Sequence, residues 1–164
     1  MVLVRGEVLV NVAHHLRPLI LRVGPTTVRN VGAQFDVRRF DSGDVIITVA
    51  HGRVDDVGSS SATPVSSGES AEIHSGIAKL NLIGVKELDR RLAWRDGWIF
   101  FTDANLVEAV RELNRYNDHQ ILISYPSIEA LRVDGQFRTT DPDSFVASLS
   151  PVYGIRPIAG ETCL

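Results

Sequence analysis

The chain has 164 residues, a length typical of one domain that also permits two small ones. Apolar residues make up 44% and charged residues 23%, which are ordinary globular values and exclude a chain that is disordered throughout. The 17 Lys and Arg against 20 Asp and Glu give a net charge of −3. This balance argues against non-specific binding of nucleic acid, which needs a basic surplus.

The single cysteine, Cys163, excludes an internal disulfide and a thiolate metal cluster. No apolar stretch approaches the ~20 residues of a membrane helix, and Arg5 follows the opening apolar residues too soon for a signal peptide. Since the chain opens directly in an alternating strand pattern, we expect a piece of a longer protein whose first strands are absent.

Short strands account for the first 75 residues. Apolar alternation or β-branched runs predict strands over 8–12, 19–23, 26–31, 34–38, 45–49 and 51–54, with turn signals every eight to ten residues. The polar stretch 58–68 reads as a loop around a weak strand, or as a linker, and 72–74 as a last strand. This spacing favours an all-β domain, either a sandwich or a solenoid-like stack.

Residues 77–92 show no clear periodicity, and we place a domain boundary near residue 92. Beyond it, strands alternate with helices. We predict a strand at 98–101, a helix over 103–117 and a strand at 120–125 ended by Pro126. Asp103 is one candidate cap of that helix, and Asn105 with Glu108 resembles a capping box.

The remainder completes a small α+β module. Asp134-Gly135 predicts a hairpin or bulge between 131–133 and 136–138. Pro142 suits the first position of a second helix, and 152–158 reads as a closing strand. The predicted order is βαβ, β, αβ, with two helices on one sheet face.

Several segments together carry a family resemblance. Arg5-Gly6-Glu7-Val8 resembles the start of the FecR-type periplasmic domain, and 17–21, 32–37, 49–54 and 65–69 resemble its later signatures in the same order. In the second half, 94–101, 113–117 (Leu-Asn-Arg-Tyr-Asn) and 133–137 resemble the family's remaining motifs. Ala33-Gln34 and His51 depart from the family pattern.

The resemblance implies a sensor and no enzyme. FecR-like proteins are single-span inner-membrane anti-sigma regulators, whose periplasmic part pairs an all-β domain with a module similar to the secretin/TonB short N-terminal (STN) domain. The expectation is therefore a FecR-like domain at 1–92 and an STN-like module at 93–164. Its partner would be the signalling domain of a TonB-dependent outer-membrane transporter relaying iron or siderophore signals. The resemblance also implies a cytoplasmic segment that binds an extracytoplasmic-function (ECF) sigma factor and a helix that spans the membrane. We expect both to lie outside this chain.

Candidate site residues follow from this expectation. Sheet edges at 120–125 and 131–137 are the candidate partner surface, with Ile121, Ile123, Tyr125, Val133 and Phe137 as its residues, because an edge strand can add a partner's strand. The aromatic cluster of Trp94, Trp98 and Phe100 is interpreted as packing the two domains together, with a partner pocket as the alternative.

We predict no catalytic residue, cofactor or metal. The five histidines, even with Asp55 or Glu72, show no ligand spacing on one element, and 59–61 lack a nucleophile elbow. Two alternatives stay open: a β-sandwich that binds a ligand or acts as an enzyme, and a self-associating module like those of secretins.

Overall fold

The computed structural model describes residues 1–13, 18–30, 32–58 and 64–155. The protein is mostly β, with several sheets and three α-helices among these residues. It divides into two units after Leu92, and we call Met1–Leu92 the β-sandwich unit and Ala93–Leu164 the α/β unit. None of the described helices is both long and apolar enough to cross a membrane.

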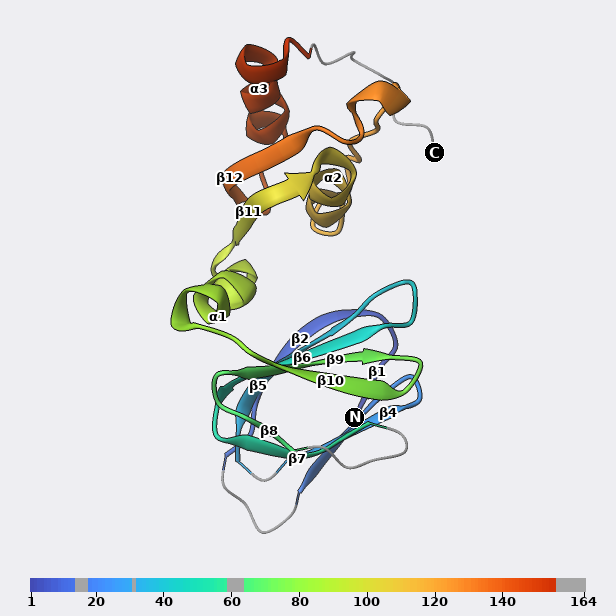
Figure 1. Ribbon diagram of the computed structural model, residues 1–164, viewed down its shortest axis with the longest axis vertical. Coiled ribbons are helices and arrows are strands. Elements are labelled where there is room, and N and C mark those ends of the chain that lie inside the picture. The colour runs from blue at the N-terminus through green and yellow to red at the C-terminus, as the bar shows by residue number, and fades with distance from the viewer. Residues whose placement is uncertain (14–17, 31, 59–63, 156–164) are drawn as a thin grey trace. The chain divides into compact units, whose positions relative to one another are not determined.

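The β-sandwich unit has two five-stranded sheets, which lie face to face as two layers in Figure 1. The first sheet has the order β1-β3-β4-β7-β8 and contains Val2–Leu3, Leu19–Val23, Thr26–Asn30, Arg53–Gly58 and Val65–Ser66. The second has the order β10-β9-β6-β5-β2 and contains Ile77–Leu82, Glu69–His74, Val45–His51, Gln34–Arg39 and Gly6–Asn11. All pairings are antiparallel except that of β1 with β3.

One apolar core joins the two sheets. Successive side chains of a strand point to opposite faces of the sheet. In a strand with one buried face, every second residue is therefore apolar. Phe35 and Val37 of β5 point into this core while Asp36 lies on the other face. The inner residues come from both sheets, including Leu21, Val23, Val28, Val54, Val57, Val65, Val45, Ile47, Val49, Ala71 and Ile73. The all-β half is therefore a sandwich.

The chain crosses between the sheets twice at one corner. β4 leads to β5 past Asn30, and β6 leads to β7 through Gly52. The fully buried Asn30 amide donates to the Arg53 carbonyl at 2.9 Å and accepts from the Gly32 and Ala33 N–H groups, both at 2.9 Å. Gly52 has φ +79°, and a Cβ on it would lie 2.9 Å from the Gly32 oxygen. Only glycine fits there without a shift in the backbone.

The β-sandwich unit ends differently from the sequence-based prediction. His74 closes β9, but it is not the end of the last strand: Ser75 and Gly76 turn the chain into β10. A helix, α1 (Val85–Leu92), then follows and contacts β6. Residues 77–82 escaped the prediction because β10 is an edge strand whose exposed and half-buried positions do not alternate cleanly.

The described part of the α/β unit contains two short 3-10 turns and a two-stranded antiparallel sheet with two helices. In chain order these are η1 (Ala93–Asp96), β11 (Trp98–Asn105), α2 (Leu106–Asn114), η2 (Pro126–Ile128), β12 (Arg132–Arg138) and α3 (Pro142–Tyr153). Both helices share one core with the sheet, formed by Ile99, Phe101, Leu106, Ala109, Val110, Leu113, Val133, Phe145 and Leu149. The rings of Phe101, Phe137 and Phe145 pack together with centroids 5.0 to 6.0 Å apart.

Three predictions for this unit were wrong. Residues 120–125 form no strand, and 132–138 form one continuous strand with Gly135 (φ +144°) inside it, so the hairpin alternative was wrong. The bulge alternative is closer, because the β11–β12 register shifts between the pairs Phe101–Gly135 and Ala104–Val133. The predicted strand 152–158 is helical as far as Tyr153, where Gly154 (φ +67°) ends α3 as a left-handed C-cap, and its last residues lie outside the described part. Pro142 does occupy the first turn of α3.

Candidate partner interface

The start of α2 is fixed by Asn105. Its side chain accepts a hydrogen bond from the Glu108 N–H at 2.8 Å, and the Glu108 carboxylate accepts one from the Asn105 N–H at 3.4 Å. This capping box satisfies two N–H groups that a helix start leaves without partners. Of the two predicted caps, Asn105 is therefore the one in use. Asp103 instead lies in an irregularity of β11 with φ +49°.

Asn114 is the last residue of α2 and binds the chain that follows. Its amide donates to the Ile121 carbonyl at 2.9 Å and accepts from the Ile121 N–H at 2.8 Å. Two residues nearby extend this attachment: the Asn117 amide donates to the Leu113 and Thr139 carbonyls, and the Gln120 amide donates to the Asn114 carbonyl at 3.0 Å. Side-chain hydrogen bonds thus fix residues 117–121, which include the start of the strand that the sequence predicts at 120–125.

Residues 121–125, which we call the unpaired segment, have the burial pattern of a strand without its hydrogen bonds. Ile121 and Ile123 are half-buried against the core of the unit, while Leu122 is 80% and Tyr125 61% exposed. Beyond Ile121, the one backbone hydrogen bond that joins this segment to another described residue is accepted by the Tyr125 carbonyl from the Ile128 N–H at 3.2 Å. The backbone groups of Leu122, Ile123 and Ser124 make no bond to any described residue.

The other predicted edge, β12, presents a polar face. Val133 is 3% exposed and Phe137 packs into the core, so these two residues serve the interior of the unit. The alternate positions Arg132, Asp134, Gln136 and Arg138 are exposed. Of the five residues predicted to bind a partner, Tyr125 is exposed, Val133 is buried, and Ile121, Ile123 and Phe137 are half-buried.

One end of β12 carries a small polar cluster. The Arg132 guanidinium donates to the Asp103 carbonyl at 2.8 Å, and the Asp103 N–H donates to the Asp134 carboxylate at 2.9 Å. The Tyr153 hydroxyl at the end of α3 donates to the Arg132 carbonyl. The first backbone acceptor of β12 is therefore already occupied.

The aromatic residues predicted to join the domains lie at the start of the α/β unit. The Arg138 guanidinium stacks 3.7 Å from the ring centre of Trp98, its cross-strand neighbour, and this is a cation–π contact. Trp94, Trp98 and Phe100 are all half-buried, and the buried Trp94 Nε1 has no hydrogen-bond partner among the described residues. Their role between the domains stays a prediction.

Among the described residues, hydrogen bonds lower the pKa of two aspartates, Asp141 and Asp44. The pKa of Asp141, the N-cap of α3, lies below its usual 3.8 because the Ser144 hydroxyl and N–H both donate to the carboxylate. The pKa of Asp44 is also lowered, first by the Ser42 hydroxyl and then by His74, whose Nδ1 is 2.8 Å from it. Among the described residues, no three or more His, Cys, Asp or Glu side chains cluster as metal ligands would.

Known structures share this fold. Two crystal structures of a candidate anti-sigma factor from Parabacteroides distasonis ATCC 8503 superpose with TM-scores of 0.76 and 0.75, both at 18% sequence identity. Each comparison covers 96% of this chain and 75% of the other. By sequence, no protein family and no curated protein matches the chain. The chain therefore has the fold of that candidate anti-sigma factor.

Proposed function

We propose that this chain is the signal-receiving part of a transmembrane regulator that controls a sigma factor. Two lines of support meet here. The fold is that of a candidate anti-sigma factor, and the motifs along the sequence resemble the FecR-type periplasmic region in the same order. In this proposal the chain lies in the periplasm as part of an inner-membrane protein, and a cytoplasmic segment of the regulator contacts an ECF sigma factor.

The α/β unit is proposed to act as an STN-like module that binds the signalling domain of a TonB-dependent transporter. The observation that carries this step is the unpaired segment: Ile121 and Ile123 pack on the core, while the backbone of residues 122–124 has no partner among the described residues. A free extended backbone beside a packed core is what strand addition requires. Backbone hydrogen bonds would then provide affinity, and Leu122 and Tyr125 would provide contacts that select the partner.

A proline substitution tests this step at the backbone. The Leu122 N–H donates to no described group, so Leu122→Pro removes a donor that the free chain does not use. We expect an unchanged unfolding transition, together with at least a tenfold loss of affinity for a transporter signalling domain in a calorimetric titration of the full chain. Val85→Asp, at an equally exposed site at the start of α1 (76% exposed), is the matched control and should bind as the parent does.

Two results would refute the proposal. One is a panel of transporter signalling domains of which none binds the parent chain. The other is binding that Leu122→Pro leaves intact, because strand addition at residues 121–125 needs that amide.

A further inference from the structure

The negative charge of the chain is concentrated in the α/β unit. Residues 93–164 contain six Lys and Arg against ten Asp and Glu, whereas residues 1–92 contain eleven against ten. The β-sandwich unit is therefore close to neutral, and the unit that contains the unpaired segment is acidic. A net charge of one sign on a binding unit attracts partners of the opposite sign and raises the rate of association.

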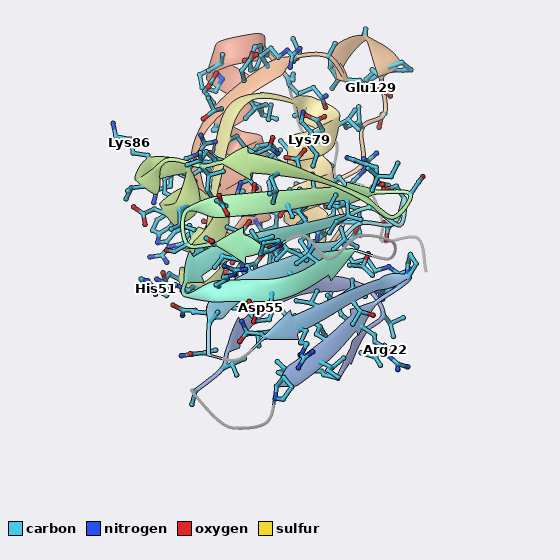
Figure 2. The ribbon with its side chains drawn as sticks, turned by 60° about the horizontal axis from the view of Figure 1, so that its bottom comes forward. Arg22, His51, Asp55, Lys79, Lys86 and Glu129 are labelled. Atoms are coloured by element: carbon cyan, nitrogen blue, oxygen red, sulfur yellow. The ribbon has the colours of Figure 1, made fainter. Side chains whose placement is uncertain are left out.

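Acidic side chains flank the unpaired segment on both sides. Residues 116–131 contain two ionisable acids, Asp118 and Glu129, and no Lys or Arg. Asp118 precedes the segment by three residues, and Glu129, which is labelled in Figure 2, follows it by four. Neither carboxylate forms an ion pair or a hydrogen bond with a described residue.

The nearest arginines in the sequence do not balance these two acids, because each is already paired with another carboxylate. The Arg115 Nη1 is 3.3 Å from the Glu112 Oε1, and the Arg132 Nε is 3.7 Å from the Asp103 Oδ1. Arg132 also donates to the Asp103 carbonyl at 2.8 Å. The unpaired segment thus has a carboxylate near each end and no basic side chain of its own stretch beside it.

Both carboxylates are close enough to act on a strand bound at the segment. Because a residue of chain spans at most about 3.6 Å, the Asp118 Cα lies within roughly 11 Å of the Ile121 Cα. The Glu129 N–H donates to the Pro126 carbonyl at 3.2 Å, so Glu129 lies one turn beyond the end of the segment. Since the screening length is about 30 Å at 0.01 M salt, both charges reach such a strand under these conditions.

We propose that the unpaired segment accepts a basic strand, with Lys or Arg near each end of the part that pairs with residues 121–125. The backbone bonds of strand addition are the same for any sequence, so side chains must select the partner. The two carboxylates favour a basic strand and repel an acidic one. Tyr125, with 61% of its surface exposed, adds a ring on which a cation can stack. This inference rests on the proposed function and names the chemistry of its partner.

Titrations of the full chain with a transporter signalling domain at two salt concentrations test the charge. Between about 0.01 M and about 1 M NaCl the screening length falls from roughly 30 Å to 3 Å, so we expect the parent to lose affinity at least about tenfold. The double variant Asp118→Asn/Glu129→Gln should bind at least about threefold more weakly than the parent at the lower salt and lose less affinity on adding salt.

The matched control removes the same net charge elsewhere. Asp41→Asn/Asp89→Asn replaces two exposed aspartates of the β-sandwich unit that bond to no described residue. This control should bind as the parent does at both salt concentrations. Equal weakening by the control and by Asp118→Asn/Glu129→Gln would show that only the overall charge matters, which contradicts selection at the segment.

The result with Leu122→Pro separates this inference from the proposed function. If Leu122→Pro abolishes binding while Asp118→Asn/Glu129→Gln binds as tightly as the parent at both salt concentrations, strand addition stands and the inference of a basic strand is wrong. Tighter binding by the double variant at low salt would indicate an acidic partner and would also overturn the inference. If no signalling domain binds the parent, the proposed function fails and this inference fails with it.

Discussion

The Asn114 side-chain amide forms two hydrogen bonds with the backbone of Ile121. It donates to the Ile121 carbonyl at 2.9 Å and accepts from the Ile121 N–H at 2.8 Å. This is the pairing that a neighbouring strand would otherwise provide. It attaches the unpaired segment to the end of α2 without occupying the backbone of the next residues. The segment is thus held at Ile121, while the backbone of residues 122–124 has no partner among the described residues.

Replacing Asn114 by alanine should free the unpaired segment. The substitution removes both hydrogen bonds, which contribute roughly 1 kcal/mol each, so we expect the free energy of unfolding of the α/β unit to fall by about 1–3 kcal/mol. Amide hydrogen exchange at Ile121 should accelerate strongly. Asn114→Asp keeps the acceptor and loses only the donor, so its Ile121 amide should stay partly protected; equal exchange in both variants would show that the acceptor contributes nothing.

Asn30 should be the most sensitive polar residue of the β-sandwich unit. It is fully buried and satisfies the Arg53 carbonyl and the N–H groups of Gly32 and Ala33. Asn30→Ala leaves three backbone groups without this partner, and each such loss costs about 1–3 kcal/mol. Urea unfolding should show a destabilisation of at least about 2 kcal/mol. A change below about 0.5 kcal/mol would mean that this corner is not held by Asn30.

Two glycines with similar backbone angles separate conformational strain from steric conflict. Gly52 (φ +79°) has the Gly32 oxygen 2.9 Å from a Cβ position, whereas Gly43 (φ +91°) has nothing within 4 Å. Both alanine variants incur the cost of a left-handed residue, about 1–2 kcal/mol. Gly52→Ala should therefore lower the melting temperature clearly more than Gly43→Ala, and equal shifts would contradict the close approach at this corner.

Asp141 should make the stability of α3 depend on pH. Its folded pKa is lowered, so the charged cap stabilises the helix above the carboxyl's ordinary pKa of 3.8 and this contribution is lost as pH falls through the lower folded value. Asp141→Asn retains an acceptor at the cap without a titrating charge. Thermal melts from pH 6 to pH 2 should show that the parent loses more stability than Asp141→Asn below about pH 4. If the melting temperatures of the two chains fall in parallel with pH, the charge of Asp141 does not stabilise α3.

The sequence indicates most strands of the sandwich because their inner residues are apolar and their outer residues polar. Val45–His51 is an example, with Ile47 and Val49 in the core. The pattern fails where burial does not follow the period. β10 was missed because an open edge leaves Leu80 and Leu82 exposed, and α1 was missed because Leu92 is its only buried residue.

At the candidate site, too, the sequence pattern does not show which hydrogen bonds the fold forms. The composition of 120–125 predicts a strand, but the backbone of Ile121 bonds to the Asn114 side chain instead of a neighbouring strand. The motif Leu113-Asn114-Arg115-Tyr116-Asn117 contains the two asparagines responsible, yet which carbonyls they reach is set by the fold. Val133 and Phe137 were chosen as edge residues because an alternating pattern does not say which face is the core.

Amide hydrogen exchange of the full chain, with and without a transporter signalling domain, tests whether a partner strand adds at residues 121–125. Strand addition uses alternate backbone groups, and the Ile121 N–H is already bonded to Asn114. We expect strong new protection at Leu122 and Ser124 on binding. Binding without new protection at these amides would show that the partner uses another surface and would contradict strand addition at this segment.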